Sequence, residues 1–140
     1  MTAKEYLLQI RRMDRLINNK IAELEQLRTL ATSITAATDR EAVQTSGVSD
    51  KVGNVVANIV DLQNEINALL DAYVDKRKEI IAQIDGIEKQ QPLYYAILHG
   101  RYIQFQSLQQ IADNEGYTAQ YMRKTHGEAL EFFKTVYTIQ

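Results

Sequence analysis

Apolar side chains recur at steps of three and four residues along most of the chain, which is the spacing of amphipathic helices. A first repeat runs from about Thr2 to Leu30. Thr2 can cap this helix, and Glu5 stands three residues on, as in a capping box. The apolar positions of the repeat share one face: Leu7, Ile10, Met13, Ile17, Ile21, Leu24 and Leu27. The pattern therefore predicts a first long helix.

A second, longer repeat follows Ser49 or Asp50, either of which can cap a helix, and continues to about Lys89. Its apolar positions form a heptad-like seam: Val52, Val55, Ile59, Leu62, Ile66, Leu69, Tyr73, Ile80 and Ile87. From Val52 onward such a helix would extend about 55 Å, and its apolar stripe needs a partner. The first helix is the nearest candidate, so the sequence predicts a long, coiled-coil-like helical hairpin.

Additional apolar positions widen the stripe of this second helix: Val56, Val60, Leu70, Val74, Ile81 and Ile84. One partner helix covers only a narrow seam, so the wider stripe favours a bundle of more than two helices. We therefore expect a homo-oligomer, a dimer or larger.

Periodicity stops between the two repeats, where Thr, Ser and Ala dominate from Thr32 to Asp50. A stretch of this length without a pattern is long for a connection inside a compact domain. We predict a loop at about 32–50, either mobile or functional.

The chain changes character at Pro92, its single proline. Nine of the eleven aromatic residues follow it, and aromatic side chains let a small domain close its core. The residue before a proline is steered away from helical angles, so Pro92 is predicted to end the long helix. This gives two domains: a helical hairpin over 1–91 and a second helical domain over 92–140, whose first helix spans about Leu93 to Phe105.

Signals for a helix-turn-helix follow within the second domain. Ser107 can cap a helix, and Gln110 completes a capping box. Gly116 stands where that helix must end, because glycine reaches the left-handed conformation at little cost. Thr118 can then cap a second helix, which residues from Gly127 to Tyr137 extend or pack beneath.

The two predicted helices have distinct inner and outer residues. Ala112 is small enough for a close crossing, and Tyr117 and Met122 offer apolar contacts there. The outer face is formed by Ala119, Gln120, Arg123 and Lys124. Such a face can enter the major groove, where Gln pairs with adenine and Arg or Lys with guanine. The alternative is an ordinary αα-hairpin in which Gly116 is a helix C-cap.

The stretch around these helices resembles the promoter-reading fourth region of sigma factors, over roughly residues 93–133. The similar features are Arg101-Tyr102 at the end of the preceding helix, Ile111-Ala112 in the first helix, Gly116-Tyr117-Thr118 at the turn, and Ala129-Leu130 after the recognition helix. The whole chain is similar to small phage and prophage proteins of Gram-positive bacteria related to late-gene transcriptional regulators of the RinA and ArpU type. The resemblance implies a DNA-binding function in the cytoplasm of a bacterial host cell.

Composition excludes several other classes of function. The chain contains no cysteine, so it has neither disulfides nor thiolate metal sites. Its two histidines, His99 and His126, have no further ligand at metal-binding spacing, and the carboxylates are spread along helices without a catalytic constellation. No run of about 18 apolar residues or signal-peptide core is present. We expect no enzyme activity, no cofactor, no metal and no membrane association.

The net charge of −2 provides no general attraction to nucleic acid, so we expect one copy to bind DNA weakly. The leading hypothesis is a phage-encoded transcriptional regulator that reads duplex DNA. Gln120, Arg123 and Lys124 would face base edges, while Thr118 and Tyr121 would touch phosphates. The alternative, motivated by Glu115, Ala119 and the neutral charge, is a helical protein that docks on host RNA polymerase or another phage regulator. A DNA-packaging adaptor is a third possibility, although such adaptors usually carry the DNA-binding domain first.

Overall fold

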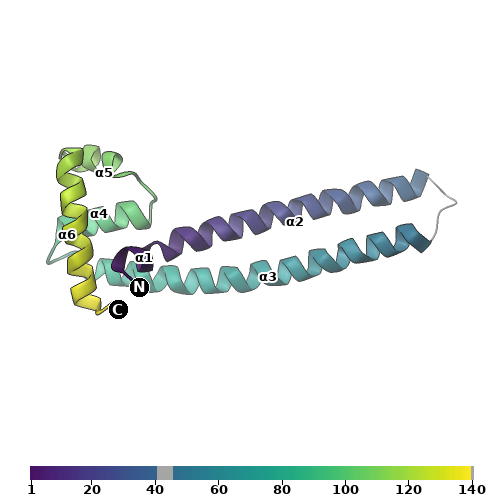
Figure 1. Ribbon diagram of the computed structural model, residues 1–140, viewed down its shortest axis with the longest axis horizontal. Coiled ribbons are helices and arrows are strands. Elements are labelled where there is room, and N and C mark those ends of the chain that lie inside the picture. The colour runs from purple at the N-terminus through teal and green to yellow at the C-terminus, as the bar shows by residue number, and fades with distance from the viewer. Residues whose placement is uncertain (41–45, 140) are drawn as a thin grey trace. The chain divides into compact units, whose positions relative to one another are not determined.

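The computed structural model describes residues 1–40 and 46–139, and within these residues all regular structure is helical (Figure 1). The helices are α1 (Ala3–Leu7), α2 (Gln9–Arg40), α3 (Ser46–Asp85), α4 (Pro92–Tyr102), α5 (Leu108–Glu115) and α6 (Ala119–Tyr137). The predicted all-α class is therefore confirmed. None of the described helices combines the length and apolar character needed to span a membrane.

The chain divides into two units that differ from the predicted domains. Residues 15–72 form one, here called the hairpin unit, and residues 1–14 together with 73–140 form the other, the α4–α6 unit. The expected boundary at Pro92 lies inside the second unit. The difference arises because Leu7 near the start of the chain and Ile84 near the end of α3 are fully buried in the same core as Phe133 of α6.

Local hydrogen bonds set the start of the first helix, as predicted. The Thr2 hydroxyl accepts from the Glu5 amide at 3.1 Å, and the Glu5 carboxylate accepts from the Thr2 amide at 3.1 Å. Leu8 separates α1 from α2, but its amide still donates to the Lys4 carbonyl at 2.9 Å. The two helices thus follow one another with a single residue between them.

The predicted loop at 32–50 is wrong for residues 32–40 and 46–50, which are helical in α2 and α3. Residues 41–45 lie outside the described part of the chain. Alanine has the highest helix propensity, and threonine can return its hydroxyl hydrogen bond to the carbonyl four residues back. Thr29 and Thr32 do so, to the carbonyls of Glu25 and Arg28, both at 3.0 Å. These bonds satisfy the hydroxyls inside the helix, and the propensity of the alanines favours a helix in a segment that has no apolar stripe.

Within the hairpin unit α2 and α3 lie side by side (Figure 1). Leu24 of α2 packs with Leu62 and Ile66 of α3, and all three are buried. Lys20 and Glu65 add an ion pair across the two helices at 3.2 Å, in which the Lys20 side chain is partly buried and the Glu65 side chain is exposed. The predicted hairpin pairing is confirmed in this unit.

The long helix ends earlier than predicted, at Asp85 rather than beside Pro92. The next residues make tight turns, in which Ile87 donates to the Ile84 carbonyl at 3.2 Å. Pro92 instead occupies the first turn of α4, where its missing amide hydrogen costs nothing because that amide has no partner within the helix.

The core of the α4–α6 unit joins segments that are distant in sequence. Its main cluster contains Leu7, Ile84, Leu98 and Phe133, all fully buried. A hydrogen bond also joins α6 to α3 at the edge of this cluster. The Tyr137 hydroxyl donates to the Gln83 carbonyl at 2.5 Å. Burial of apolar surface from five helices provides the main stabilisation of this unit.

Two helical glycines test this packing. A Cβ on Gly100 would lie 3.0 Å from Ile111 Cγ1, whereas a Cβ on Gly53 would meet no heavy atom within 4 Å. We expect Gly53→Ala to raise the free energy of unfolding by about 0.5–1 kcal/mol, since alanine loses less backbone entropy. Gly100→Ala should lower it by about 1–3 kcal/mol through overpacking between α4 and α5. Urea unfolding followed by circular dichroism measures both, and equal effects would contradict the packing described.

Candidate nucleic-acid interface

The helix α5 is fixed at both ends by local hydrogen bonds. The Ser107 hydroxyl accepts from the Gln110 amide at 3.1 Å, and the Gln110 side chain accepts from the Ser107 amide at 2.8 Å. At the other end Gly116 has φ of 77°, and its amide donates to the Ala112 carbonyl. This left-handed conformation carries little cost for glycine alone. Both the capping box and the C-cap agree with the sequence prediction.

The turn leads directly into α6. The hydroxyl of Thr118 accepts from the Tyr121 amide at 3.1 Å, which caps the new helix. Helix α6 then runs without a break to Tyr137, so the segment from Gly127 onward continues the second helix. Only Gly116, Tyr117 and Thr118 separate α5 from α6.

The inner faces of these helices form a small core with α4. Ile97, Ile111, Ala112 and Met122 are buried together. Ala112 is fully buried, as expected for a close helix crossing. The inner face of α6 continues through Thr125, whose hydroxyl donates to the Tyr121 carbonyl at 2.8 Å. This packing fixes the rotation of α6 about its axis.

The outer face of α6 carries the residues predicted to read DNA. Gln120, Arg123 and Lys124 are exposed, and Thr118 and Tyr121 are exposed beside them. Residues 120, 123, 124 and 127 follow helical spacing, so they share one side of the first two turns. The fold thus brings all five predicted residues to the same end of one helix.

Tyr117 does not take the buried position expected of it. Its side chain is 46% exposed and stacks on Tyr121, with ring centroids 4.9 Å apart. Met122 alone fills the crossing from this side. The physical reason is local: Tyr117 lies in the turn between the left-handed Gly116 and the N-cap Thr118, so it belongs to the inner face of neither helix.

A partly buried polar pair joins the back of α6 to α4. The Tyr102 hydroxyl and His126 Nε2 are 2.7 Å apart, and their rings stack. Burial lowers the pKa of His126 from 6.5 to about 4, and the nearby cations Arg101 and Lys4 act in the same direction. Burial also raises the pKa of Tyr102 to about 12. The histidine is therefore neutral at pH 7, and a single hydrogen bond joins its Nε2 to the phenolic oxygen.

Sequence reasoning considered His126 as a metal ligand, and it missed this contact with Tyr102. The two residues are 24 positions apart in the sequence, and no local pattern pairs residues at such a separation. Arg101 also has a structural partner, because its guanidinium donates to the Gln106 carbonyl at 3.1 Å.

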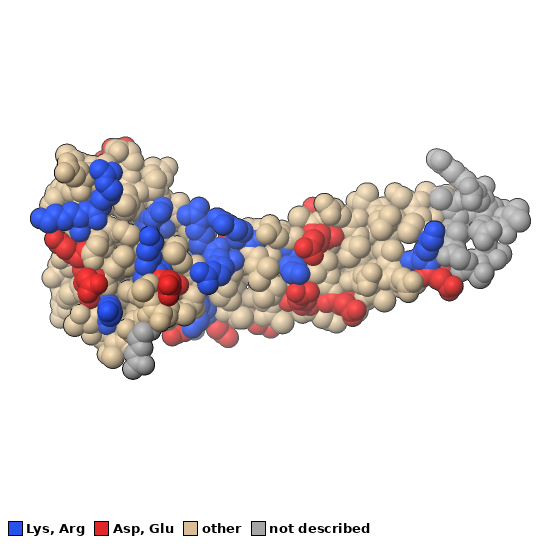
Figure 2. Space-filling view, in the orientation of Figure 1, with Lys and Arg blue, Asp and Glu red and all other residues tan. Residues whose placement is uncertain are grey.

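Charge is unevenly distributed between the two units. The α4–α6 unit contains 11 Lys and Arg residues against 10 Asp and Glu, whereas residues 15–72 contain 5 against 8. Figure 2 shows Lys and Arg side chains on the drawn face of the α4–α6 unit, with Asp and Glu side chains among them. Arg11 contributes to this unit with its guanidinium 5.8 Å from the centre of the Phe105 ring. Lys and Arg therefore slightly outnumber Asp and Glu in the α4–α6 unit, whereas the whole chain has a net charge of −2. This unit is the part of the chain more favourable to an anionic partner.

Among the described residues no group of three or more His, Asp or Glu side chains could hold a metal ion. Searches for similar proteins found no match to a family model, to a curated protein or to a solved structure.

The partly buried histidine makes stability depend on pH. In the unfolded chain His126 titrates near 6.5, so as pH falls the unfolded state binds the proton first. We expect the free energy of unfolding to lose about 2 kcal/mol between pH 6.5 and 4, after allowance for the remaining solvent contact of the ring. Urea unfolding at several pH values measures this loss. His126→Gln should remove that part of the dependence, and an unchanged profile would contradict it.

Proposed function

We propose that this protein is a phage-encoded transcriptional regulator of the late-gene activator type, with α5 and α6 acting as a sigma-region-four-like helix-turn-helix on duplex DNA. One observation carries the proposal. The inner face of α6 is fixed by Met122 in a buried core, and this leaves Gln120, Arg123 and Lys124 together on its exposed first turns. A recognition helix requires this division between a rigid inner face and a polar outer face.

The exposed side chains fit the chemistry of the major groove. Gln120 can donate to and accept from adenine, and Arg123 or Lys124 can donate to the two acceptors of guanine. Thr118 and Tyr121 lie at the N-terminus of α6, where backbone amides and the helix dipole favour a phosphate. In this function the base contacts specify the sequence and the phosphate contacts set the register.

Docking on a protein such as host RNA polymerase is a second candidate. The stacked pair Tyr117 and Tyr121, 46% and 43% exposed, favours it, since exposed tyrosines are common energetic centres of protein interfaces. Binding to polymerase without promoter DNA that survives Arg123→Ala/Lys124→Ala but is lost in Tyr117→Ala would support this candidate over DNA reading.

The first test removes the proposed reading residues. Arg123→Ala/Lys124→Ala should weaken binding to a specific fragment of the phage genome by at least about tenfold, because each base contact contributes about 1–3 kcal/mol. Fluorescence anisotropy across a salt series measures the affinity. Lys78→Ala/Lys89→Ala, two exposed lysines of the same unit, is the matched control. Equal affinity of the reading-face variant and the wild type would refute the proposed assignment.

The second test uses an open position on the same face. A Cβ on Gly127 or on Gly53 would meet no heavy atom within 4 Å, so both sites accept a side chain. We expect Gly127→Lys to strengthen DNA binding and Gly127→Glu to weaken it, because the two differ by two charges near the phosphates. Gly53→Lys and Gly53→Glu, on α3 of the hairpin unit, should leave affinity nearly equal. A charge effect of the same size at Gly53 would argue against a defined DNA-binding face.

A further inference from the structure

Helix α1 packs on α6 within the unit that contains the proposed DNA-binding helices. The rings of Tyr6 and Phe133 are 6.2 Å apart between centroids. Lys4 belongs to the same short helix and is exposed. Burial lowers the pKa of His126, and Arg101 and Lys4 lower it further, so both cations lie near this residue of α6. The start of the chain therefore brings an exposed cation to the flank of α6.

The first turn of α2 brings a second cation to the loop between α4 and α5. The guanidinium of Arg11 lies 5.8 Å from the centre of the Phe105 ring. Phe105 has φ of 57°, a left-handed conformation that is rare and costly for a bulky residue and that persists only where the surroundings hold it. Beside it, the Gln106 amide donates to the Gly100 carbonyl at 2.9 Å. Arg11 thus contacts an ordered loop, which lowers the side-chain entropy it loses on meeting a partner.

Arg101 lies between the sites of these two cations. Its guanidinium donates to the Gln106 carbonyl at 3.1 Å, next to Phe105. The following residue, Tyr102, is joined through its hydroxyl to His126. A guanidinium has five N–H donors, so this one can still donate to an anion. The three cations, here called the basic surface, lie along the flank of α6 and the loop between α4 and α5: Lys4, Arg101 and Arg11.

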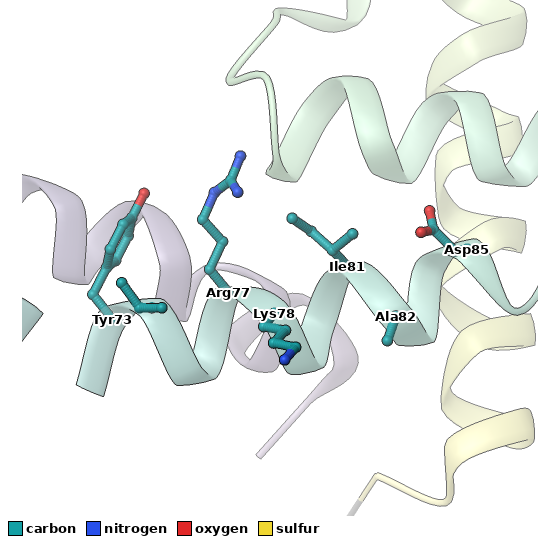
Figure 3. Close-up of a pocket in the computed structure, with 7 residues that line it drawn as sticks. Tyr73, Arg77, Lys78, Ile81, Ala82 and Asp85 are labelled. Atoms are coloured by element: carbon teal, nitrogen blue, oxygen red, sulfur yellow. The ribbon is translucent and has the colours of Figure 1, made fainter. Parts of the chain in front are cut away.

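A hollow along the last turns of α3 has two further cations in its lining, Arg77 and Lys78, together with the carboxylate of Asp85. The two cations leave the helix in different directions. Figure 3 shows that the Arg77 side chain extends toward the side of α3 on which α4 is drawn, whereas Lys78 does not. Lys78 is therefore a suitable comparison for the basic surface, because it belongs to the same unit and is exposed.

The reading face of α6 supplies few phosphate contacts of its own. Its charged residues are Arg123 and Lys124, and the same helix carries the exposed carboxylates Glu128 and Glu131. Attraction to phosphates supplies a large share of the affinity of DNA-binding proteins. A unit whose charges nearly balance therefore needs further cations placed at the DNA backbone.

We propose that Lys4 and Arg11 bind the phosphate backbone of duplex DNA, beside the groove into which α6 inserts. This inference rests on the proposed function, because it assigns a second contact with the same partner. Both residues come from the first turns of the chain, outside α5 and α6, so the N-terminal segment forms part of the DNA-binding surface. Phosphate contacts carry no sequence information. The basic surface would therefore set affinity and orientation, and the reading face would set the sequence preference.

Salt dependence distinguishes a phosphate contact from a base contact. Lys4→Gln/Arg11→Gln should reduce the slope of log affinity against log salt concentration by about 2, because each phosphate contact contributes about 0.9. At low salt it should weaken binding to the specific fragment and to an unrelated duplex by the same factor, about tenfold or more. Fluorescence anisotropy measures both quantities. Lys78→Gln/Lys89→Gln, which removes the same charge from exposed positions of this unit, is the matched control and should keep nearly the wild-type slope.

The outcomes separate this inference from the proposed function. A wild type that binds the specific fragment, with a slope that Lys4→Gln/Arg11→Gln leaves unchanged, would overturn the inference and leave the function standing. An equal loss of slope in the lysine control would also overturn it, since net charge alone would then explain the effect. A wild type that binds no duplex would overturn both. Urea unfolding checks the fold of each variant, and Lys4→Gln alone, at an exposed position, should still reduce the slope by about 1.

Discussion

The structure of the α4–α6 unit depends on the burial of one side of α6 in two separate clusters. Met122, near the start of the helix, packs with Ile111 and Ala112 of α5. Phe133, about three turns later, packs in the larger cluster with Leu7 and Ile84. Because both anchors belong to one continuous helix, neither the angle nor the rotation of α6 can change without loss of apolar contact. The proposed reading residues therefore have fixed directions within this unit.

Local chemistry explains which parts of this arrangement could be predicted from sequence. Ser107, Gly116 and Thr118 act through hydrogen bonds or backbone angles within four residues, and the structure agrees with each. The helical spacing of Gln120, Arg123 and Lys124 likewise depends on α6 alone. The predictions for these parts needed no knowledge of distant contacts.

Predictions failed where helix propensity or distant packing decides the outcome. The segment at 32–40 has no apolar stripe and is nevertheless helical, and its alanines are the residues whose intrinsic propensity favours this. The end of α3 was placed at Pro92 because proline was the strongest local signal, whereas the helix stops at Asp85. The contact between Tyr102 and His126 and the close approach of Gly100 to Ile111 depend on how α4 meets its neighbours. Periodicity in one segment contains no information on such encounters.

The separation of the two faces of α6 has a consequence for how this protein can diverge. Gln120, Arg123 and Lys124 lie outside both hydrophobic clusters, so replacing them changes stability by no more than about 0.5 kcal/mol. Met122, Ala129 and Phe133 tolerate few replacements because they fill those clusters. Descendant chains can therefore acquire new targets by exchanging a handful of exposed residues while their folding is preserved. Among such descendants the inner residues of α6 would remain recognisable long after the outer ones had lost all similarity.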